Sequence, residues 1–370
     1  MSESLSIEQV RLLRLQGQHL HRNPMTDVGQ LISVLCGLQS QELASASLAI
    51  RARTQGLTLE DVNHAREIDR SIVLTWTMRG TMHLISSEDI GWLLKLLGST
   101  FIHKTERRYK QLGLSEATRY KGTERIQNAL GEHGALTRAE LANELKKYDI
   151  PVAGQAIHHL VRYTALAGVI CFGADRDGEL TYVLVDDWLK TIPQRELSDD
   201  QIYVQLARCY LNAYAPAKLD DFVRWSGLPK KDAREGWNAI SGEMIDVEIG
   251  DYQAVILEQQ LALLADTQDE PTVRLLPRYD NYPLGHTSRD FMVSANYAKQ
   301  IHPGGGIIHP SVILDGYAIG TWRIQRKAKY NIILIEPFES INANIIPLLE
   351  AEVQDIGHFL DKATRLQVKP

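Results

Sequence analysis

The chain has 370 residues, of which 44% are hydrophobic and 23% are charged. At about 150 residues per domain, this length predicts two to three domains of an ordinary globular protein. The formal net charge of -6 disfavours a polybasic protein that coats nucleic acid, because the molecule as a whole does not attract a polyanion. Only a locally basic face would meet DNA.

Membrane, targeting and metal-binding classes are also disfavoured. The N-terminus lacks a basic flank followed by an apolar run, and no segment offers about 18 uncharged apolar residues. The three cysteines, Cys36, Cys171 and Cys209, lie far apart without a C-x-x-C spacing, which supports neither a disulfide framework nor a zinc site. We therefore expect a cytoplasmic protein without membrane contact, metal or cofactor.

The first hundred residues are predicted to form helices and then a β-ribbon. Their periodicity predicts helices over residues 7–20, 28–35 and 42–53 and strands over residues 72–76 and 79–85. Ser6 and Asp27 precede the first two helices as N-caps. Three helices followed by a two-stranded ribbon are typical of a winged helix, a variant of the helix-turn-helix.

The same order of elements recurs twice. The second copy has predicted helices over residues 115–133, 138–147 and 153–167 and strands over residues 169–172 and 180–185. The third has predicted helices over residues 199–213, 219–225 and 230–240 and strands over residues 245–249 and 252–257. A spacing of about 80 residues favours three tandem units over a solenoid of shorter repeats.

The chain becomes rich in strands and turns from Pro271 onward. Predicted strands cover residues 273–276, 306–308, 311–314, 317–324 and 330–335, and a last helix covers residues 341–365. Asp315-Gly316 between two of these strands is a strong hairpin signal. The predicted class is α+β, with three winged-helix units over residues 1–100, 101–195 and 196–268 and a small β-barrel domain over residues 269–370.

Positive charge gathers in two stretches of this net acidic chain. Residues 103–125 hold seven Lys/Arg against three Glu, and residues 274–329 hold eight Lys/Arg against three Asp. Such asymmetry favours one cationic face. Solvated helix faces without a partner explain the same pattern.

The first candidate site is Gln39-Ser40-Gln41, at the junction of two predicted helices. If this segment is extended, both glutamine side chains point to the same side, about 7 Å apart. Two polar residues that cap a helix start would give the same pattern.

Two further segments carry candidate binding residues. Arg79, Thr81 and His83 alternate, so on a strand they share one face that suits phosphate and sugar or, equally, an ion pair with Glu88 or Asp89. Residues 276–282, with Arg289 and then residues 316–323, interleave basic and aromatic side chains, which suits a nucleic-acid clamp or a turn-rich packing surface.

These segments together resemble the AlkZ-like family of bacterial winged-helix proteins. The resemblance rests on Gln39–Gln41, on Trp76–Leu84, on Leu275–Asp280, on Leu314–Gly316 and on Gly320–Arg323, in the family's order along nearly the whole chain. It implies three winged helices and a β-barrel in a C-shaped body. It also implies a DNA glycosylase that excises alkylated purines and unhooks interstrand crosslinks.

The family's catalytic motif is Gln-x-Gln or Gln-x-Asp with an aliphatic residue between, so the resemblance assigns catalysis to Gln39 and Gln41, with Ser40 as a departure. The candidate DNA contacts are Arg51, Arg79, Thr81, His83, Arg278, Tyr279, Asp280, Arg289, Tyr317 and Arg323. We expect a monomer that binds double-stranded DNA with alkylated bases.

Two amides are chemically sensible for this reaction. Gln does not titrate, so it is no general base. An N3- or N7-alkylated purine is already cationic and leaves as a neutral base, so the protein needs mainly to place a water and to offer dipoles to a cationic transition state. The alternatives are a non-catalytic DNA-binding regulator, with helices at 43–53, 154–167 or 230–240 in the major groove, and a protein-binding scaffold.

Overall fold

The computed structural model describes residues 3–21, 24–265 and 270–369, which form a mixed α+β structure. The chain divides into two compact units: unit 1 comprises Met1–Val62 and Tyr203–Pro370, and unit 2 comprises Asn63–Ile202. Two helices run through the boundaries, α4 (Leu59–Glu67) and α11 (Asp199–Tyr214). The predicted division into four parts stays a prediction, and its limit at 268/269 lies outside the described residues.

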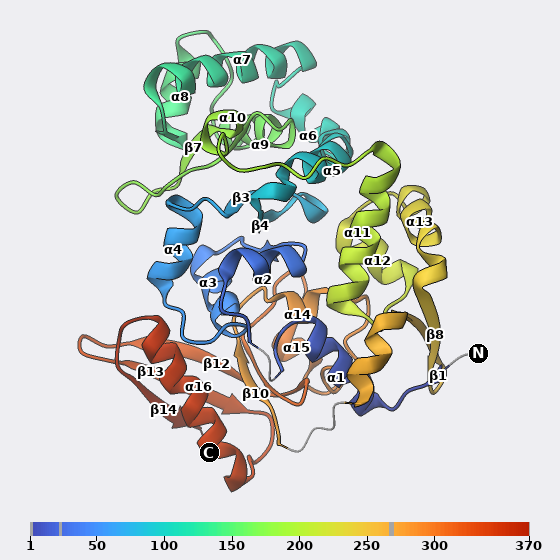
Figure 1. Ribbon diagram of the computed structural model, residues 1–370. Coiled ribbons are helices and arrows are strands. Elements are labelled where there is room, and N and C mark those ends of the chain that lie inside the picture. Colours follow the sequence, from blue (N-terminus) through green and yellow to red (C-terminus); the bar gives the residue numbers. More distant parts are fainter. Residues whose placement is uncertain (1–2, 22–23, 266–269, 370) are drawn as a thin grey trace. The chain divides into compact units, whose positions relative to one another are not determined.

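Unit 1 combines helices from both ends of the chain with two sheets (Figure 1). Its other helices are α1 (Ile7–Gly17), α2 (Val28–Val34), α3 (Leu43–Arg51), α12 (Leu219–Ser226), α13 (Lys230–Ala239), α14 (Asn281–Leu284), α15 (Ala298–Ile301) and α16 (Ile346–Phe359). Its strands are β1 (Glu3–Ser4), β2 (Leu38–Gln39), β8 (Met244–Ile249), β9 (Tyr252–Leu257), β10 (Val273–Leu276), β11 (Ser311–Leu314), β12 (Tyr317–Arg326), β13 (Asn331–Pro337) and β14 (Thr364–Val368).

The larger sheet of unit 1 has the order β10-β11-β12-β13-β14 and is antiparallel except for the parallel pair β13–β14. Helix α16 packs along it (Figure 1). We expected a barrel here, but in the described part of the chain β10 and β14 are the two edges of this order. The hairpin at Asp315-Gly316 is confirmed, with φ of 50° and 79° at the two turn residues.

One core cluster joins the two ends of the chain within unit 1. Leu15, Leu20 and Ala52 from the N-terminal helical region pack with Leu276, Tyr282 and other side chains that follow β10. A second cluster fills the space between the larger sheet and α16. Helix α1 and the C-terminal end of α3 therefore rest on the C-terminal β region.

Unit 2 contains two small antiparallel β elements and a set of packed helices. Its helices are α5 (Ile90–Lys104), α6 (Glu106–Gln111), α7 (Glu116–His133), α8 (Arg138–Lys146), α9 (Ala156–Leu166) and α10 (Val185–Trp188). Its strands are β3 (Ile72–Trp76), β4 (Met82–Ser86), β5 (Leu136–Thr137), β6 (Ile170–Phe172) and β7 (Thr181–Leu184). Helices α5 and α9 approach closely at Gly98, where a Cβ would stand 2.1 Å from the Leu166 carbonyl oxygen.

Local sequence signals account for most of these elements. Ser6 with Gln9, and Thr137 with Glu140, form capping boxes at the starts of α1 and α8, and Asp27 caps α2. The helices and strands predicted from residue 115 to residue 257 are confirmed, with ends shifted by a few residues. Caps and periodicity act over a few residues, so they can be read without knowing the tertiary structure.

Three expectations about elements were wrong, and the helices α4 and α5 were not predicted. The predicted strand over residues 79–85 begins only at Met82, because Arg79 lies in a short 3-10 turn with φ of 56°. Residues 306–308 form no strand, since Gly304, Gly305 and Gly306 all have positive φ in an exposed turn. The predicted last helix ends at Phe359, and Thr364–Val368 forms β14, whose side chains alternate in exposure.

Candidate active site

The two glutamines of the predicted motif lie on an extended segment of unit 1, with their side chains in contact. Gln39 ends β2, is 6% exposed, and donates from Nε2 to Oε1 of the exposed Gln41 at 3.0 Å. The segment leaves α2 through a turn in which Cys36 and Gly37 have positive φ. The extended geometry brings both amides to one side, as the spacing predicted for an extended segment.

Ser40, between the two glutamines, is fully buried. Its hydroxyl donates to the Leu38 carbonyl oxygen at 2.7 Å. A buried hydroxyl is costly only when it lacks a hydrogen bond. The serine is therefore accommodated where the family pattern has an aliphatic residue.

The segment Arg278–Asn281 of unit 1 contacts the glutamine motif on both flanks. Arg278 Nη1 donates to Glu42 Oε1 at 2.6 Å, directly after Gln41. Asn281 Oδ1 accepts from the Gln39 backbone N–H at 3.1 Å, and Asn281 Nδ2 donates to the Gly37 carbonyl at 2.9 Å. These partners are 236 to 244 residues away in the chain, so no local pattern could have revealed that Glu42 and the glutamine motif contact this segment.

Asp280, a predicted DNA contact, is instead an internal anchor. It is 1% exposed, and its two carboxylate oxygens accept from Nη1 and Nη2 of Arg53 at 2.8 and 2.7 Å. It also caps α14 through the Tyr282 N–H. The preceding Tyr279 has φ of 58°, a conformation that costs a non-glycine residue of order 1–3 kcal/mol. We revise Asp280 to a residue that holds the Arg278–Asn281 segment in place.

Arg51 is a second correction. Its guanidinium is 2% exposed and donates to Glu352, to Asp355 and to the Leu275 carbonyl. These three partners lie in unit 1 and the guanidinium is buried, so a phosphate does not reach it. Arg51 joins α3 to α16 and the sheet instead of contacting DNA.

The row Arg79, Thr81 and His83 in unit 2 does not form one exposed strand face. Arg79 and Thr81 are partly exposed and belong to the turn before β4, whereas His83 is 2% exposed within β4. Burial, and then the positive charge of Arg79, lower the pKa of His83 to about 3, against the hydrogen bond to the Thr81 carbonyl. A buried neutral imidazole is not a phosphate contact, so His83 is also revised.

Three other predicted contacts keep some exposure, namely Tyr317 and Arg323 in β12 and Arg289 after α14. Tyr317 and Arg323 both belong to β12, and a β-bulge separates them, because Ala318 pairs with Ile313 and Gly320 pairs with Val312. Arg11 stacks over the Tyr317 ring with 4.4 Å between the guanidinium carbon and the ring centre. Arg289 is partly buried, donates to the Pro283 carbonyl, and has a pKa lowered by burial and then by Arg224.

A polar pocket of about 450 Å³ brings two of the predicted arginines together in unit 1. Arg278 and Arg323 line it, with His309, Gln300 and Glu336 among the other residues. Arg323 pairs with Glu336 at 3.2 Å, and Arg278 pairs with Glu42 beside Gln41. Both arginine side chains are more than a third exposed. The pocket therefore offers two accessible cations next to the glutamine motif.

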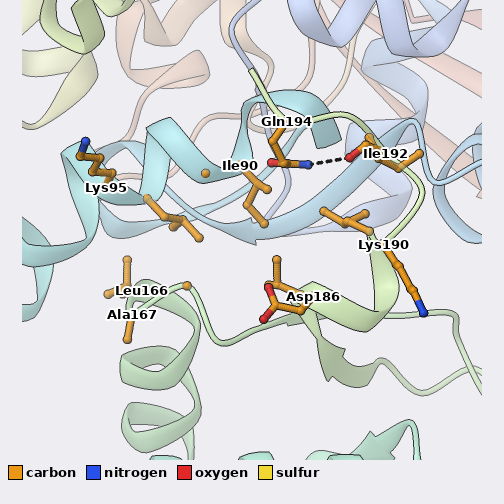
Figure 2. A pocket seen from close by; sticks show the side chains of 13 residues that line it. Ile90, Lys95, Leu166, Ala167, Asp186, Lys190, Ile192 and Gln194 are labelled. Carbon is orange, nitrogen blue, oxygen red and sulfur yellow. Dashed lines mark hydrogen bonds between the residues drawn. The ribbon is translucent and has the colours of Figure 1, made fainter. Parts of the chain in front are cut away.

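A second pocket, of about 620 Å³, lies in unit 2 between α5, the end of α9 and the chain after β7 (Figure 2). Lys95, Asp186, Lys190 and Gln194 are its polar lining, and Lys95 pairs with Asp199 at 2.5 Å. None of the predicted site residues lines it. Size alone does not make it the active site, because the paired amides lie elsewhere.

The described residues hold neither a metal cluster nor a membrane span. Among them, no group of three or more His, Cys, Asp or Glu side chains is placed to hold a metal ion. No helix in residues 3–21, 24–265 and 270–369 is long and apolar enough to cross a membrane. Cys36, Cys171 and Cys209 are free thiols.

Comparison with known proteins gives consistent results at the level of family and fold. The model of a family described as DNA glycosylase AlkZ-like matches residues 32–359. An interstrand DNA cross-link repair glycosylase from Streptomyces sahachiroi is 27% identical over 367 residues, which cover 95% of this chain and 96% of the relative. The solved structure of Streptomyces sahachiroi DNA glycosylase AlkZ is similar with a TM-score of 0.85 and 24% identity, over 99% of this chain and all of that one.

The fold and the match of the family model define a DNA glycosylase, an enzyme that cleaves the bond between a base and its sugar. The chain belongs to the AlkZ-like family of DNA glycosylases. This membership decides for an enzyme over a regulator or a scaffold.

Proposed function

We propose that this glycosylase hydrolyses the N-glycosidic bond of purines alkylated at N3 or N7 in duplex DNA, and that it unhooks interstrand crosslinks made through such bases. The observation that carries the proposal is the 3.0 Å contact between the amides of Gln39 and Gln41 on an extended segment. The similarity to a cross-link repair glycosylase supports the choice of substrate.

The reaction needs little acid–base catalysis from the protein. In an N3- or N7-alkylated purine the base carries a positive charge, so the glycosidic electron pair passes to the base and releases it neutral. Water then supplies the new C1′–O bond and loses a proton to solvent. The protein has to place that water and to stabilise a positively charged sugar, which oriented dipoles can do.

The two amides divide this work in a way that follows from their contacts. Gln39 is buried and donates to Gln41 Oε1, which fixes the direction of the Gln41 carbonyl. An amide oxygen has two lone pairs, so Gln41 Oε1 can accept a second hydrogen bond, from the attacking water. A group of this kind is worth about 3 kcal/mol of transition-state stabilisation in other enzymes.

DNA contacts are assigned to the accessible members of the predicted set. Arg278 and Arg323 line the pocket beside the motif, and each pairs with a single carboxylate that a phosphate can replace. The other proposed contacts are Arg79, Thr81, Tyr279, Arg289 and Tyr317. A bifunctional lyase needs an amine at the site, and the glutamine motif has no Lys, so the proposed enzyme is monofunctional.

We also infer that the helical segments are winged helices. Helices α7, α8 and α9 followed by the β6–β7 hairpin, and helices α11, α12 and α13 followed by the β8–β9 hairpin, have the expected order. The C-shaped body, the monomeric state and the cytoplasmic location stay predictions.

The test is single-turnover release of 7-methylguanine, and of a crosslinked base, from duplex DNA. Gln41→Ala is expected to abolish release while duplex binding remains. Gln55→Ala, at an exposed glutamine just after α3, is the matched control that keeps release. Since no ionisable base is used, the rate should change little between about pH 6 and 9. Full release by Gln41→Ala, or a sharp bell in the pH profile, would overturn the mechanism.

A further inference from the structure

Asn281 has contacts that set it apart from the other side chains around the glutamine motif. It is 4% exposed, at the start of α14. Its Oδ1 accepts from the backbone N–H of Gln39 at 3.1 Å, and its Nδ2 donates to the carbonyl of Gly37 at 2.9 Å. One side-chain amide thus contacts the backbone on both sides of Leu38.

This pair of hydrogen bonds reproduces one residue of a neighbouring β-strand. In an extended segment the carbonyl of one residue and the N–H of the residue two further along point to the same side, and a strand neighbour contacts both through its own N–H and carbonyl. The carboxamide of Asn281 offers the same donor and acceptor. The donor of Gln39 and the acceptor of Gly37 also fix which way the amide is oriented.

Asn281 is itself held on both sides by buried contacts. The preceding Asp280 has both carboxylate oxygens on Arg53. The following Tyr282 is 6% exposed and donates its hydroxyl to the Gly316 carbonyl at 2.9 Å. The carboxamide therefore has a defined position relative to both the N-terminal helices and the larger sheet of unit 1.

We propose that Asn281 is a positioning residue of the active site, which keeps Leu38 and Gln39 extended after the turn at Gly37 so that Gln39 can direct the Gln41 amide. The inference rests on the proposed function of the two glutamines and deepens it. Asn281 acts through the backbone of Gln39, and the water-holding group is Gln41.

The sharpest variant is Asn281→Asp, because its behaviour depends on protonation. A neutral carboxyl has one donor and one acceptor and replaces the carboxamide. An ionised carboxylate only accepts, so one oxygen would face the Gly37 carbonyl without a proton between them. Burial raises the pKa of such a carboxyl above its usual value near 4. Excision by Asn281→Asp is therefore expected to approach the parent rate at about pH 5 and to fall about tenfold or more by pH 8.

The parent protein should show no such pH profile over the same range. Duplex affinity of Asn281→Asp should change by less than about twofold, so that the loss appears in the single-turnover rate and not in binding. Asn331→Asp is the matched control, because Asn331 is a buried asparagine of β13 in the same unit. Its rate relative to the parent should be independent of pH, even if the variant is less stable.

A second measurement does not depend on catalysis. In the free protein, the backbone N–H of Gln39 should exchange its hydrogen faster in Asn281→Ala than in the parent. Its exchange rate should be unchanged in Asn331→Ala. Parallel pH profiles for the parent and Asn281→Asp, or unchanged Gln39 exchange in Asn281→Ala, would overturn the proposal. A parent without excision activity would instead refute the proposed function, and the exchange measurement would still decide the role of Asn281.

Discussion

The C-terminal end of α3 and the outward face of β12 both carry arginines that the sequence predicted to contact DNA, yet these charges have opposite surroundings. Arg51 in α3 is 2% exposed and contacts two carboxylates and a carbonyl. Arg323 in β12 has a side chain that is 56% exposed and pairs with Glu336 alone. A buried charge has to be paired with an opposite charge, whereas an exposed pair contributes little and can exchange its partner. Burial therefore separates structural arginines from those available to a phosphate.

The largest change in the free energy of unfolding is expected at the fully buried ion pair Arg53–Asp280. Both side chains are fully buried, and the contact is bidentate. Asp280→Ala leaves the Arg53 charge without its carboxylate, which costs about 3–5 kcal/mol when a buried pair is broken. Urea unfolding followed by circular dichroism measures this loss.

The matched control removes both charges. Arg53→Met combined with Asp280→Leu leaves no unpaired charge and should recover most of the free energy of unfolding lost by Asp280→Ala. If Asp280→Ala costs less than about 1 kcal/mol, the pair is not the anchor that the comparison requires.

His83 extends the comparison to a buried group that can give up its charge. Its pKa is lowered to about 3 by burial and then by Arg79, whereas an unfolded chain has a histidine pKa near 6.5. Below pH 6.5 the unfolded chain thus binds a proton that the native protein does not. The free energy of unfolding should fall as the pH falls from 6.5 towards 3, by up to about 1.4 kcal/mol per pH unit from this one group.

His83→Gln removes this titration. When the pH is lowered from 7 to 5, the free energy of unfolding of the variant should decrease by about 2 kcal/mol less than that of the parent. Urea unfolding at a series of pH values gives both slopes. Equal slopes for the parent and the variant would mean that His83 is protonated in the native protein as well.

The elements that the sequence predicted correctly are those whose signals lie in neighbouring residues. The caps at Ser6, Asp27 and Thr137 and the hairpin at Asp315-Gly316 depend on neighbouring residues, and the structure contains them. The signal for β14 was present in the alternation of Thr364–Val368, but the preceding helical pattern obscured it. Local chemistry predicts the elements better than their contacts.

The site could be predicted only where its interacting residues are close together in the sequence. The spacing of Gln39 and Gln41 predicted adjacent amides for an extended segment, and the structure has their 3.0 Å contact. Arg51 and Asp280 looked like surface groups because a charge carries no mark of burial in the sequence. Their partners Glu352 and Arg53 lie 301 and 227 residues away. Only the folded chain reveals such pairs.

The smallest effect on stability is expected at the exposed extreme, Arg323. Its pair with Glu336 is half exposed, so Arg323→Ala should change the free energy of unfolding by less than about 0.5 kcal/mol. Duplex affinity should weaken, because the variant lacks one cation that neutralises a phosphate. Binding then releases fewer counterions from the DNA. The slope of log affinity against log salt should then decrease by about one.

Arg326→Ala is the matched control, because Arg326 is also exposed in β12 but lies three residues further, on the opposite face of the strand. Fluorescence anisotropy with a labelled duplex at several salt concentrations measures both variants. A decrease in slope for Arg323→Ala alone would place DNA on the face of β12 that carries Arg323. Equal decreases in slope for both variants would mean that any exposed arginine of β12 contacts phosphate, whichever face of the strand it is on.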